Sequence, residues 1–243
     1  MLTENKNWQS RTELLLGPEK LEKLKNKHVL VAGLGGVGSA AAEMLCRAGI
    51  GELTIVDNDT FHLSNLNRQL PATQSKIGHF KADVVAEKLL DINPLLKIHI
   101  VKSYLKDATL LEIVSHPYDY MIDAIDTFSP KTFFIIRGLE KGQKIVSSMG
   151  AGGKLDPLKI RVADISETHT CHLAFQLRKR LKRHQVRTGF KAVFSEESII
   201  PGSMIYSDES QNKKTNVGTI SYMPVIFGCV AASVVIRDLL EIE

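Results

Sequence analysis

A glycine-rich segment and the carboxylate that follows it are the first residues whose spacing suggests chemistry. The segment has the spacing GxGxxG and reads Gly33-Leu34-Gly35-Gly36-Val37-Gly38. It lies between a short β-branched run and a helix-forming stretch, so its backbone can approach a phosphate while helix N–H groups point at the negative charge. Asp57 stands 19 residues beyond Gly38, where a carboxylate can accept hydrogen bonds from ribose hydroxyls. The pattern predicts a site for NAD, FAD, a methyl donor or ATP, with a purely structural glycine turn as the alternative.

Four polar residues downstream narrow the choice of nucleotide. Asn65, Arg68 and Lys81 follow the ribose acid, and Asp126 follows a later apolar run. Hydride transfer has no evident use for two further cations, whereas cleavage of a triphosphate develops charge on oxygens that cations stabilise. Asp126 is well placed to hold Mg²⁺. Taken one at a time, Arg68 and Lys81 can be explained as solvated surface charges and Asp126 as a helix cap. The combination of all four residues favours ATP as the nucleotide.

Two common nucleotide-site motifs are missing from the sequence. The chain has no GxxxxGK[ST] phosphate loop and no YxxxK pair. Their absence counts against a Walker-type NTPase and against a short-chain dehydrogenase.

The elements that must position these residues alternate between strand and helix. Apolar, β-branched runs predict strands at 28–32, 53–56, 98–101, 118–124 and 144–147. Helix-forming stretches predict helices at 39–48, 81–91 and 133–141. With right-handed crossovers, this order predicts an α/β fold with a doubly wound, mainly parallel sheet of Rossmann type.

Composition excludes several classes of protein. The 243 residues are 44% hydrophobic and 24% charged, which excludes a disordered or collagen-like chain. Three cysteines without a CxxC pair exclude a disulfide framework and a four-thiolate zinc site. The polar first 11 residues lack an apolar signal core, so we expect a cytoplasmic protein.

Two segments near the end of the chain differ sharply in character. The apolar run at 220–236 spans 17 residues and contains Pro224 and Gly228. A bilayer span needs about 20 predominantly apolar residues, so we predict a core helix, with the proline in its first turn, and no stable membrane association. The polar segment at 207–219 is typical of a mobile surface loop.

The cysteines offer a separate chemical hypothesis. Cys171 lies between His169 and His172, and flanking histidines can activate a thiol as a nucleophile or relay. An ordinary surface or half-buried cysteine is the interpretation we favour. The two histidines have i, i+3 spacing, but without a third ligand they do not predict a metal site. Cys46 and Cys229 fall in apolar stretches and are predicted to be core residues.

The ordered motifs resemble those of the ThiF/MoeB/HesA superfamily, adenylating enzymes related to ubiquitin-activating enzymes. The resemblance is carried by the segments 30–39, 53–59, 64–69 and 124–127 together with Lys81. It implies that a substrate carboxylate attacks the α-phosphate of ATP, giving an acyl-adenylate and pyrophosphate.

The resemblance also implies roles for individual residues. Asp57 would bind ribose, Asp126 would serve Mg²⁺ and the reaction, and the phosphates would be contacted by Asn65, Arg68 and Lys81. A homodimer is implied, in which Arg11 reaches into the site of the partner subunit. A monovalent cation near the active site is a further family feature, for which this sequence identifies no ligand.

Within the superfamily, further segments point to one family. Members that activate ubiquitin-like carriers usually keep a zinc-binding pair of CxxC motifs and often a catalytic cysteine, and no CxxC motif exists here. The segments 11–17 (RTELLLG), 147–150 (SSMG), 178–181 (RKRL) and 193–196 (VFSE) look most like the tRNA threonylcarbamoyladenosine dehydratases. That resemblance implies adenylation of a threonyl carboxylate next to the anticodon, followed by ring closure by a nucleophile of the same side chain. A tethered nucleophile has a high effective molarity and needs no protein thiol.

The resemblance suggests how the chain is divided. We expect one adenylating domain over 1–243, with a nucleotide-binding core at 28–153 and an extension at 154–243 that binds substrate and supports the dimer. Two rivals stay open: adenylation of the C-terminal glycine of a ubiquitin-like sulfur carrier, and a nucleotide-binding sulfur-relay module without turnover. A sulfur-relay protein therefore stays open as a partner.

A basic tract bears on the acceptor molecule. Its cations are Arg178, Lys179, Arg180, Lys182 and Arg183. Arg178, Lys182 and Gln185 on one side, with leucines at 177 and 181 on another, predict an amphipathic helix with a cationic face. Such a face suits phosphate contacts. A merely solvated helix face is the alternative, and the family resemblance favours tRNA.

Overall fold

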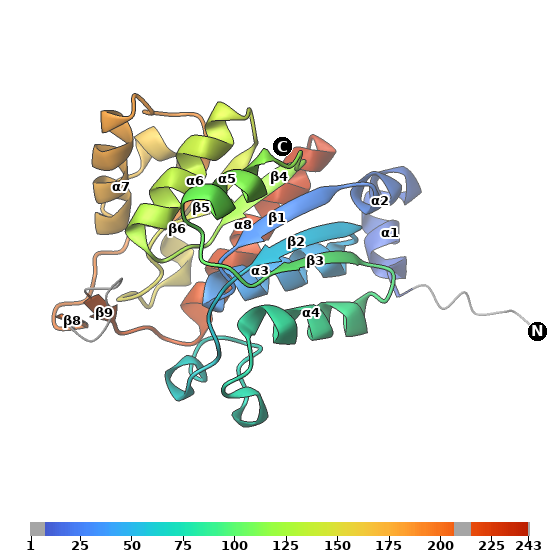
Figure 1. Cartoon of the computed structure of the whole chain (residues 1–243), viewed down its shortest axis with the longest axis horizontal. Helices are drawn as coiled ribbons and strands as arrows, with labels where there is room; N and C mark the ends of the chain where they lie inside the picture. Colours follow the sequence, from blue (N-terminus) through green and yellow to red (C-terminus); the bar gives the residue numbers. More distant parts are fainter. Residues whose placement is uncertain (1–7, 207–214, 243) are drawn as a thin grey trace, which may run out of the picture.

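The computed structural model describes residues 8–206 and 215–242, and its central feature is a seven-stranded sheet (Figure 1). The strand order is β3-β2-β1-β4-β5-β7-β6. The strands are β1 (His28–Ala32), β2 (Glu52–Val56), β3 (Lys97–Val101), β4 (Tyr120–Asp123), β5 (Ile145–Ser148), β6 (Ile160–Asp164) and β7 (Lys191–Ser195). Neighbours pair in parallel except β6 with β7, so the predicted doubly wound α/β fold is confirmed.

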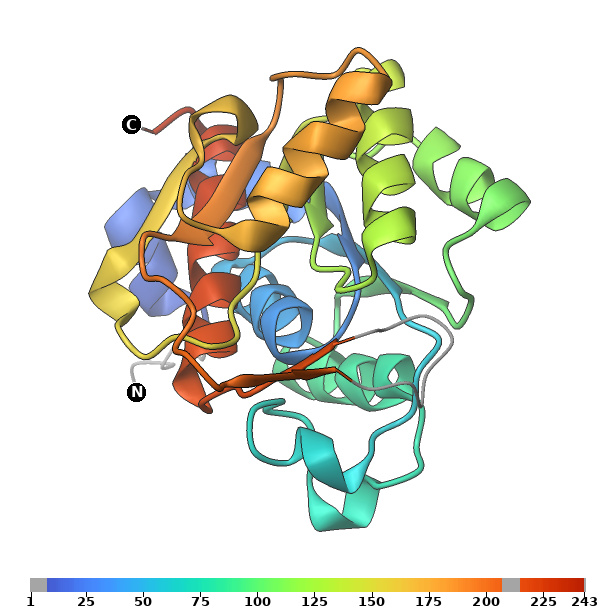
Figure 2. The ribbon, with the colours of Figure 1, turned by 90° about the vertical axis from the view of Figure 1, so that its left-hand side faces the viewer.

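Helices cover both faces of the sheet (Figure 2). One apolar cluster joins the sheet to α3 (Gly36–Ala48), α4 (Lys81–Ile92) and α8 (Tyr222–Leu240). A second joins the opposite face to α5 (Asp107–Ser115), α6 (Phe128–Glu140) and α7 (His172–Arg183). The short helices α1 (Ser10–Leu16) and α2 (Pro18–Lys25) lie beside the amino ends of the strands, and β8 (Met204–Tyr206) pairs with β9 (Thr215–Val217) in a separate hairpin.

The order in which strands are added to the sheet reverses at β1, and this switch point positions the site. β1 lies between β2 and β4, with Ala32 in register with Val56 on one side and Asp123 on the other. In an open α/β sheet, ligands bind beyond the carboxyl ends of the strands at such a switch point. The segments after residues 32, 56 and 123 therefore meet at one edge.

Most predicted elements in the first 150 residues form, with shifted ends. The helix predicted at 133–141 begins earlier, at Phe128, because Pro130 occupies its first turn, where a missing N–H costs no helical hydrogen bond. The strand predicted at 118–124 is shorter, and α3 extends back to Gly36. The helices α1, α2 and α5 and the strands β6 to β9 were not predicted. β6 and β7 join the same sheet as the core strands.

The apolar run near the end of the chain forms α8, which extends to Leu240. Of the described helices, it is the one long and apolar enough to cross a membrane, yet it packs against α3 and the sheet. The backbones of α3 and α8 approach closely, since a Cβ at Gly228 would stand 2.3 Å from the carbonyl oxygen of Val37. The predicted loop at 207–219 lies outside the described residues from 207 to 214, and β9 occupies 215–217.

Candidate active site

The glycine segment forms a tight turn from β1 into α3. Gly33 has a φ of +87°, and its N–H donates to the carbonyl of Val56 at 2.8 Å. A Cβ at Gly38 would stand 1.7 Å from the carbonyl oxygen of Gly33, so the turn excludes any side chain there. By contrast, a Cβ at Gly35 would meet nothing closer than 3.8 Å. The loop is therefore packed on its inner side and open at Gly35, at the N-terminus of α3, where a phosphate can approach the backbone.

Asp57 lies beside this turn at the end of β2. Its Oδ2 accepts the N–H of Leu34 at 2.6 Å, and its Oδ1 accepts the N–H of Asp59 at 2.8 Å. Burial raises the pKa of Asp57, while the nearby Lys81 and the two backbone donors act in the opposite direction. The carboxylate is therefore fixed against the glycine turn, at the position where ribose-binding carboxylates stand in folds of this type.

Two cations and a carboxylate from distant segments surround the same edge. Lys81, the first residue of α4, is only 6% exposed and pairs with Asp59, Nζ to Oδ2 3.0 Å. Arg68 donates to the carbonyl of Ser64 at 2.7 Å, and Asp126 acts on it electrostatically. Burial lowers the pKa of Arg68, an effect that Asp126 opposes. Arg68, Lys81 and Asp126 thus converge as predicted, and the pair with Asp59 shows a partner for Lys81 that the sequence reasoning missed.

The segment around Asn65 packs directly on the glycine turn. A Cβ at Gly36 would stand 2.9 Å from the carbonyl oxygen of Arg68. Asn65 is buried, and its Oδ1 accepts the N–H of His62 at 3.0 Å, so this oxygen shapes the local turn. Gln69 is 6% exposed, and among the described residues its buried Oε1 has no hydrogen-bond partner. An unsatisfied acceptor beside Gly35 fits a site that awaits a polar ligand.

A buried ion pair supports the loop that carries Asp126, and sequence reasoning missed it. Asp123 and Lys131 are both fully buried, with Oδ2 and Nζ 2.7 Å apart. Lys131 also donates to the carbonyls of Ile125 at 3.2 Å and Ser148 at 2.8 Å. The hydroxyl of Ser147 donates to Asp123 at 2.5 Å. These contacts tie the segment after β4 to the end of β5. An aspartate ending a strand four buried residues long was the available signal.

Lys154 is a second cation that was not predicted. It is 3% exposed, and its Nζ donates to the carbonyl of Gly150 at 3.0 Å. Gly150 follows β5 at the carboxyl-end edge of the sheet, so Lys154 brings positive charge to this rim.

Arg11 lies far from the glycine turn of its own chain. It is an exposed residue of α1, and the residue before this helix, Gln9, packs against Gly49 at the far end of α3. α3 has 13 residues, so at 1.5 Å per residue about 20 Å separate the two ends. The single chain therefore does not bring Arg11 to the other site residues.

The basic tract is partly occupied by contacts within the protein. Arg178 donates to the hydroxyl of Thr168. Arg180 donates to Ser129 at 3.1 Å and lies over the rings of Phe128 and Phe133. Both arginines are half-buried. Two of the five candidate tRNA-contacting cations are therefore partly engaged within the protein, because α7 uses them to pack on α6 and η4 (Ile165–Glu167).

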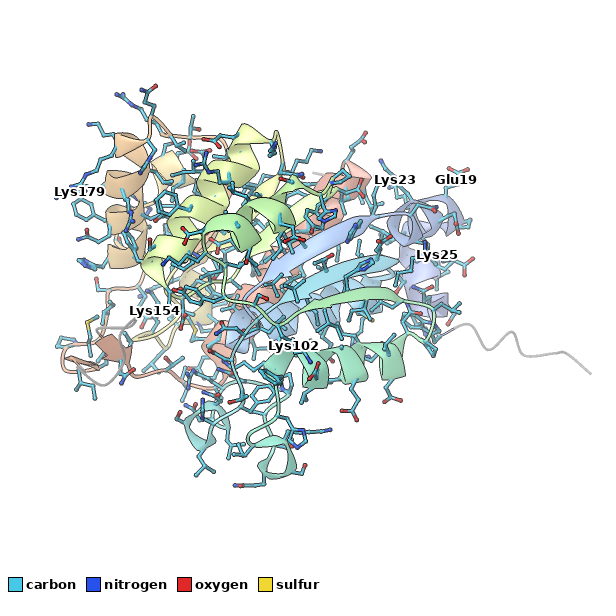
Figure 3. The ribbon with its side chains drawn as sticks, in the orientation of Figure 1. Glu19, Lys23, Lys25, Lys102, Lys154 and Lys179 are labelled. Carbon is cyan, nitrogen blue, oxygen red and sulfur yellow. The ribbon has the colours of Figure 1, made fainter. Side chains whose placement is uncertain are left out.

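The other three cations of the tract face solvent. Lys179, Lys182 and Arg183 are exposed, and Figure 3 shows Lys179 on the outer side of α7. The helix ends at Arg183, so Gln185, with a φ of +63°, lies beyond it rather than on its face. The apolar side is confirmed, since α7 buries Leu177 and Leu181.

The three cysteines differ in burial. Cys171 is the residue before α7, is 4% exposed and packs in the apolar cluster of the α6–α7 face. It is therefore buried, whereas the favoured interpretation from the sequence was a surface or half-buried cysteine. Cys46 is a core residue as predicted, whereas Cys229 is only half-buried.

Comparison with known proteins gives these features a context. The ThiF family matches residues 9–243. The sequence is 37% identical over 239 residues to the tRNA threonylcarbamoyladenosine dehydratase of Bacillus subtilis, covering 96% of this chain and 94% of that protein. It is 36% identical over 203 residues to the Escherichia coli protein of the same name, covering 79% and 76%. The fold matches the crystal structure of E. coli tRNA N6-threonylcarbamoyladenosine dehydratase in complex with ATP with a TM-score of 0.86, at 33% identity and covering 95% and 93% of the two chains.

Proposed function

Because the chain belongs to the ThiF family, we propose that it uses ATP to adenylate the threonyl carboxylate of threonylcarbamoyladenosine in tRNA. Ring closure with loss of water follows. The family predicted from the sequence motifs is confirmed. The relatives that share this name are similar over nearly the whole chain, which supports carrying their substrate over to this protein.

The observation that carries the proposal is the convergence of charge at the open side of the glycine turn. Lys81 from α4, Arg68 from the segment after β2 and Asp126 from the segment after β4 meet where β1 ends. Two cations stabilise the charge that develops on phosphate oxygens when a carboxylate displaces pyrophosphate. Asp59 pairs with Lys81, and the phosphates of ATP would compete with this carboxylate for the lysine.

The carboxylates of this edge fit Mg²⁺, which prefers oxygen ligands and binds through one or two carboxylates plus substrate phosphates. We assign Asp126 to this ion, with Asp59 within the same cluster of charges. The ion would supply further charge stabilisation at the phosphates. We assign no described residue to the monovalent cation.

Ring closure needs no nucleophile from the protein. The attacking group belongs to the same side chain as the activated carboxylate, and such tethering replaces a bimolecular step. The burial of Cys171 agrees with this chemistry. Because ring closure uses no protein thiol, a sulfur-relay partner would have no function in the reaction.

We propose that tRNA lies along the outer face of α7. Leu173, at the start of this helix, lies beside Gly150 of the active-site rim, where an added Cβ would stand 3.9 Å from the Cβ of Leu173. The 12 residues of α7 extend about 18 Å away from that point. Phe175 is 51% exposed and four residues before Lys179, so an aromatic ring and cations share one face. Rings stack on unpaired bases, and cations contact phosphates.

Two further features support a homodimer as the working unit. Arg11 lies on α1, away from the site of its own chain, which agrees with the expected role of this arginine at the site of a second subunit. Leu14 and Leu15 on the same helix are 81% and 82% exposed, and a partner surface would cover them. We place the protein in the cytoplasm, where tRNA is modified, with residues 154–243 completing the substrate and dimer surfaces.

The reaction is tested with tRNA that carries the open form of the modification. Incubation with ATP and Mg²⁺, followed by mass analysis of the digested nucleosides, should show the loss of one water mass. Asp126→Asn should lower turnover at least ~100-fold, as removal of a transition-state contact does, whereas Asp91→Asn, on the exposed side of α4, should leave it unchanged. If the protein without substitutions removes no water from this tRNA, the proposal is refuted.

The same assay separates the two rivals. Pyrophosphate exchange that requires a carrier ending in Gly-Gly indicates sulfur-carrier activation. Bound ATP that is never consumed indicates a module without turnover.

The tRNA surface is tested by its salt dependence. Replacing Lys179, Lys182 and Arg183 together by alanine should weaken tRNA binding and lower the slope of log K against log salt by up to about 2, since each phosphate contact contributes about 0.7 for single strands. Lys25→Ala, on α2 at the opposite end of the molecule (Figure 3), is the matched control. If the triple variant and Lys25→Ala bind tRNA with equal affinity, tRNA does not bind along the outer face of α7.

A further inference from the structure

Two histidines and a glutamate gather on the sheet at the end opposite the glycine turn. His28 and Glu52 are the first residues of β1 and β2, and His99 is in the middle of β3. One ligand atom from each of them lies within 4.8 Å of the others. On this face β1 and β2 pack against α5 through Leu30 and Val56, and the three side chains lie beyond that apolar cluster, with His28 and Glu52 half-buried and His99 exposed. The cluster is independent of the proposed function, which uses the carboxyl ends of the strands.

The pairing of the strands explains why the three side chains meet. Glu52 is in register with His28, and Thr54 is in register with His99. Because side chains alternate along a strand, residues 52 and 54 of β2 point to one face, and their register partners point to that face too. The cluster is therefore held by three hydrogen-bonded strands rather than by loops.

The distances suit a small metal ion. Glu52 Oε1 lies 2.8 Å from His99 Nε2 and 3.5 Å from His28 Nδ1. Zinc bonds of about 2.0–2.2 Å to nitrogen and oxygen place tetrahedral ligands roughly 3.4 Å apart. Small side-chain rotations bring the three atoms to that spacing.

A neighbouring hydroxyl already orients one imidazole. His28 Nε2 lies 2.8 Å from Thr54 Oγ1, and Thr54 is 4% exposed. When Nε2 carries the proton and donates to this hydroxyl, the lone pair of Nδ1 points toward Glu52. Metal-bound histidines commonly hold their second nitrogen in this way. The edge of the Tyr118 ring system packs against the same imidazole, with centroids 4.8 Å apart, and restricts its rotation.

We propose that His28, Glu52 and His99 bind one Zn²⁺ ion per chain, with water as the fourth ligand. Imidazole and carboxylate are ligands that zinc accepts, and three protein ligands with one open position form a known class of zinc site. On binding, His99 gives up to solvent the proton on Nε2 that faces Glu52 and keeps a proton on Nδ1, so that the Nε2 lone pair and the carboxylate both face the ion. The ion would join the edge strand β3 to β2 and β1, and its effect would be on stability.

Zinc binding is measured on the full chain after treatment with a chelator. Competition with a metallochromic chelator should give one Zn²⁺ per chain, and above the Kd the Tm should rise with the logarithm of the free Zn²⁺ concentration. His99→Ala and Glu52→Gln should each abolish both effects, with folding checked by circular dichroism. Since His99 is an exposed side chain, its removal leaves the fold intact.

Two further variants sharpen the test. Thr54→Val should weaken zinc binding by about 10-fold or more, as loss of a supporting hydrogen bond does. His184→Ala removes an exposed histidine beyond α7 and should keep one Zn²⁺ per chain. The proposal is overturned if the unmodified chain binds no zinc, or if His99→Ala binds it as well as the unmodified chain. Dehydration of tRNA is measured in parallel, and its failure with intact zinc binding would count against the proposed function alone.

Discussion

Replacing Lys131 by methionine tests the buried ion pair beneath the active site. The change removes the donor to Asp123 at 2.7 Å, to the Ser148 carbonyl at 2.8 Å and to the Ile125 carbonyl at 3.2 Å. Methionine fills similar volume but donates nothing, so a fully buried carboxylate keeps only the hydroxyl of Ser147 and one backbone N–H. Breaking a buried pair in this way costs about 3–5 kcal/mol.

Urea denaturation followed by circular dichroism measures this loss. With a urea m-value of about 2 kcal/mol/M, a loss of 4 kcal/mol lowers the midpoint by about 2 M. Lys76→Met is the matched control, because its pair with Glu87 is partly exposed, with 31% and 69% of the side chains accessible; it should cost less than about 1 kcal/mol. Adding Asp123→Asn to Lys131→Met should recover about half of the loss, since no uncompensated charge stays buried.

The outcome that refutes this reasoning is equally specific. If Lys131→Met lowers the midpoint no more than Lys76→Met, the pair does not stabilise the site. If the double variant is less stable than Lys131→Met alone, charge compensation is not the reason for the loss. Turnover measured without denaturing urea should also fall for Lys131→Met. The carbonyl of Ile125 loses its hydrogen-bond donor, and the neighbouring Asp126 is then held less firmly.

Three further results are expected. Gly38→Ala should prevent stable folding because its Cβ would overlap the carbonyl oxygen of residue 33, whereas Gly35→Ala should fold normally, as thermal unfolding shows, but bind ATP at least ~10-fold more weakly by calorimetry. Lys81→Ala should abolish turnover yet change the urea midpoint little, because its partner carboxylate is 60% exposed; unchanged turnover would remove this lysine from the site. Burial raises the pKa of Cys46 to about 11, so at pH 8 its thiol stays protonated and iodoacetamide should modify the half-buried Cys229 first, as peptide mass analysis would show.

The core of the fold could be predicted because its signals are local. Buried strands such as β1 and β4 are short apolar runs, and the helices between them have helix-forming composition. The segments before and after the core carried weaker signals. β6 has five residues of which none is fully buried, and α1 and α2 are short helices at the surface, so neither hydrophobic periodicity nor length distinguished them from loops.

The functional residues also fall into a group that the sequence indicated and a group that it did not. The glycine turn and four side chains (Asp57, Arg68, Lys81 and Asp126) were candidates from the sequence. Asp57 and Asp126 come soon after strands, and Lys81 begins a helix at the same edge of a parallel sheet, whereas Arg68 lies in the irregular segment between β2 and α4. The metal-ligand cluster of His28, Glu52 and His99 could not, because strand register joins residues that are up to 71 positions apart (28 and 99).

By itself, the order of residues determined the phosphate-binding turn, the alternation of strand and helix, and the family to which the chain belongs, since all three depend on neighbours within a few positions. Tertiary structure alone decided which charges are available. In the folded chain Lys131 forms a buried ion pair with Asp123, Arg180 lies over two aromatic rings, and Lys179 is exposed to solvent. The physical reason is that the free energy of a charge depends on burial and on partners brought from distant segments, and neither can be read from the residue's place in the chain.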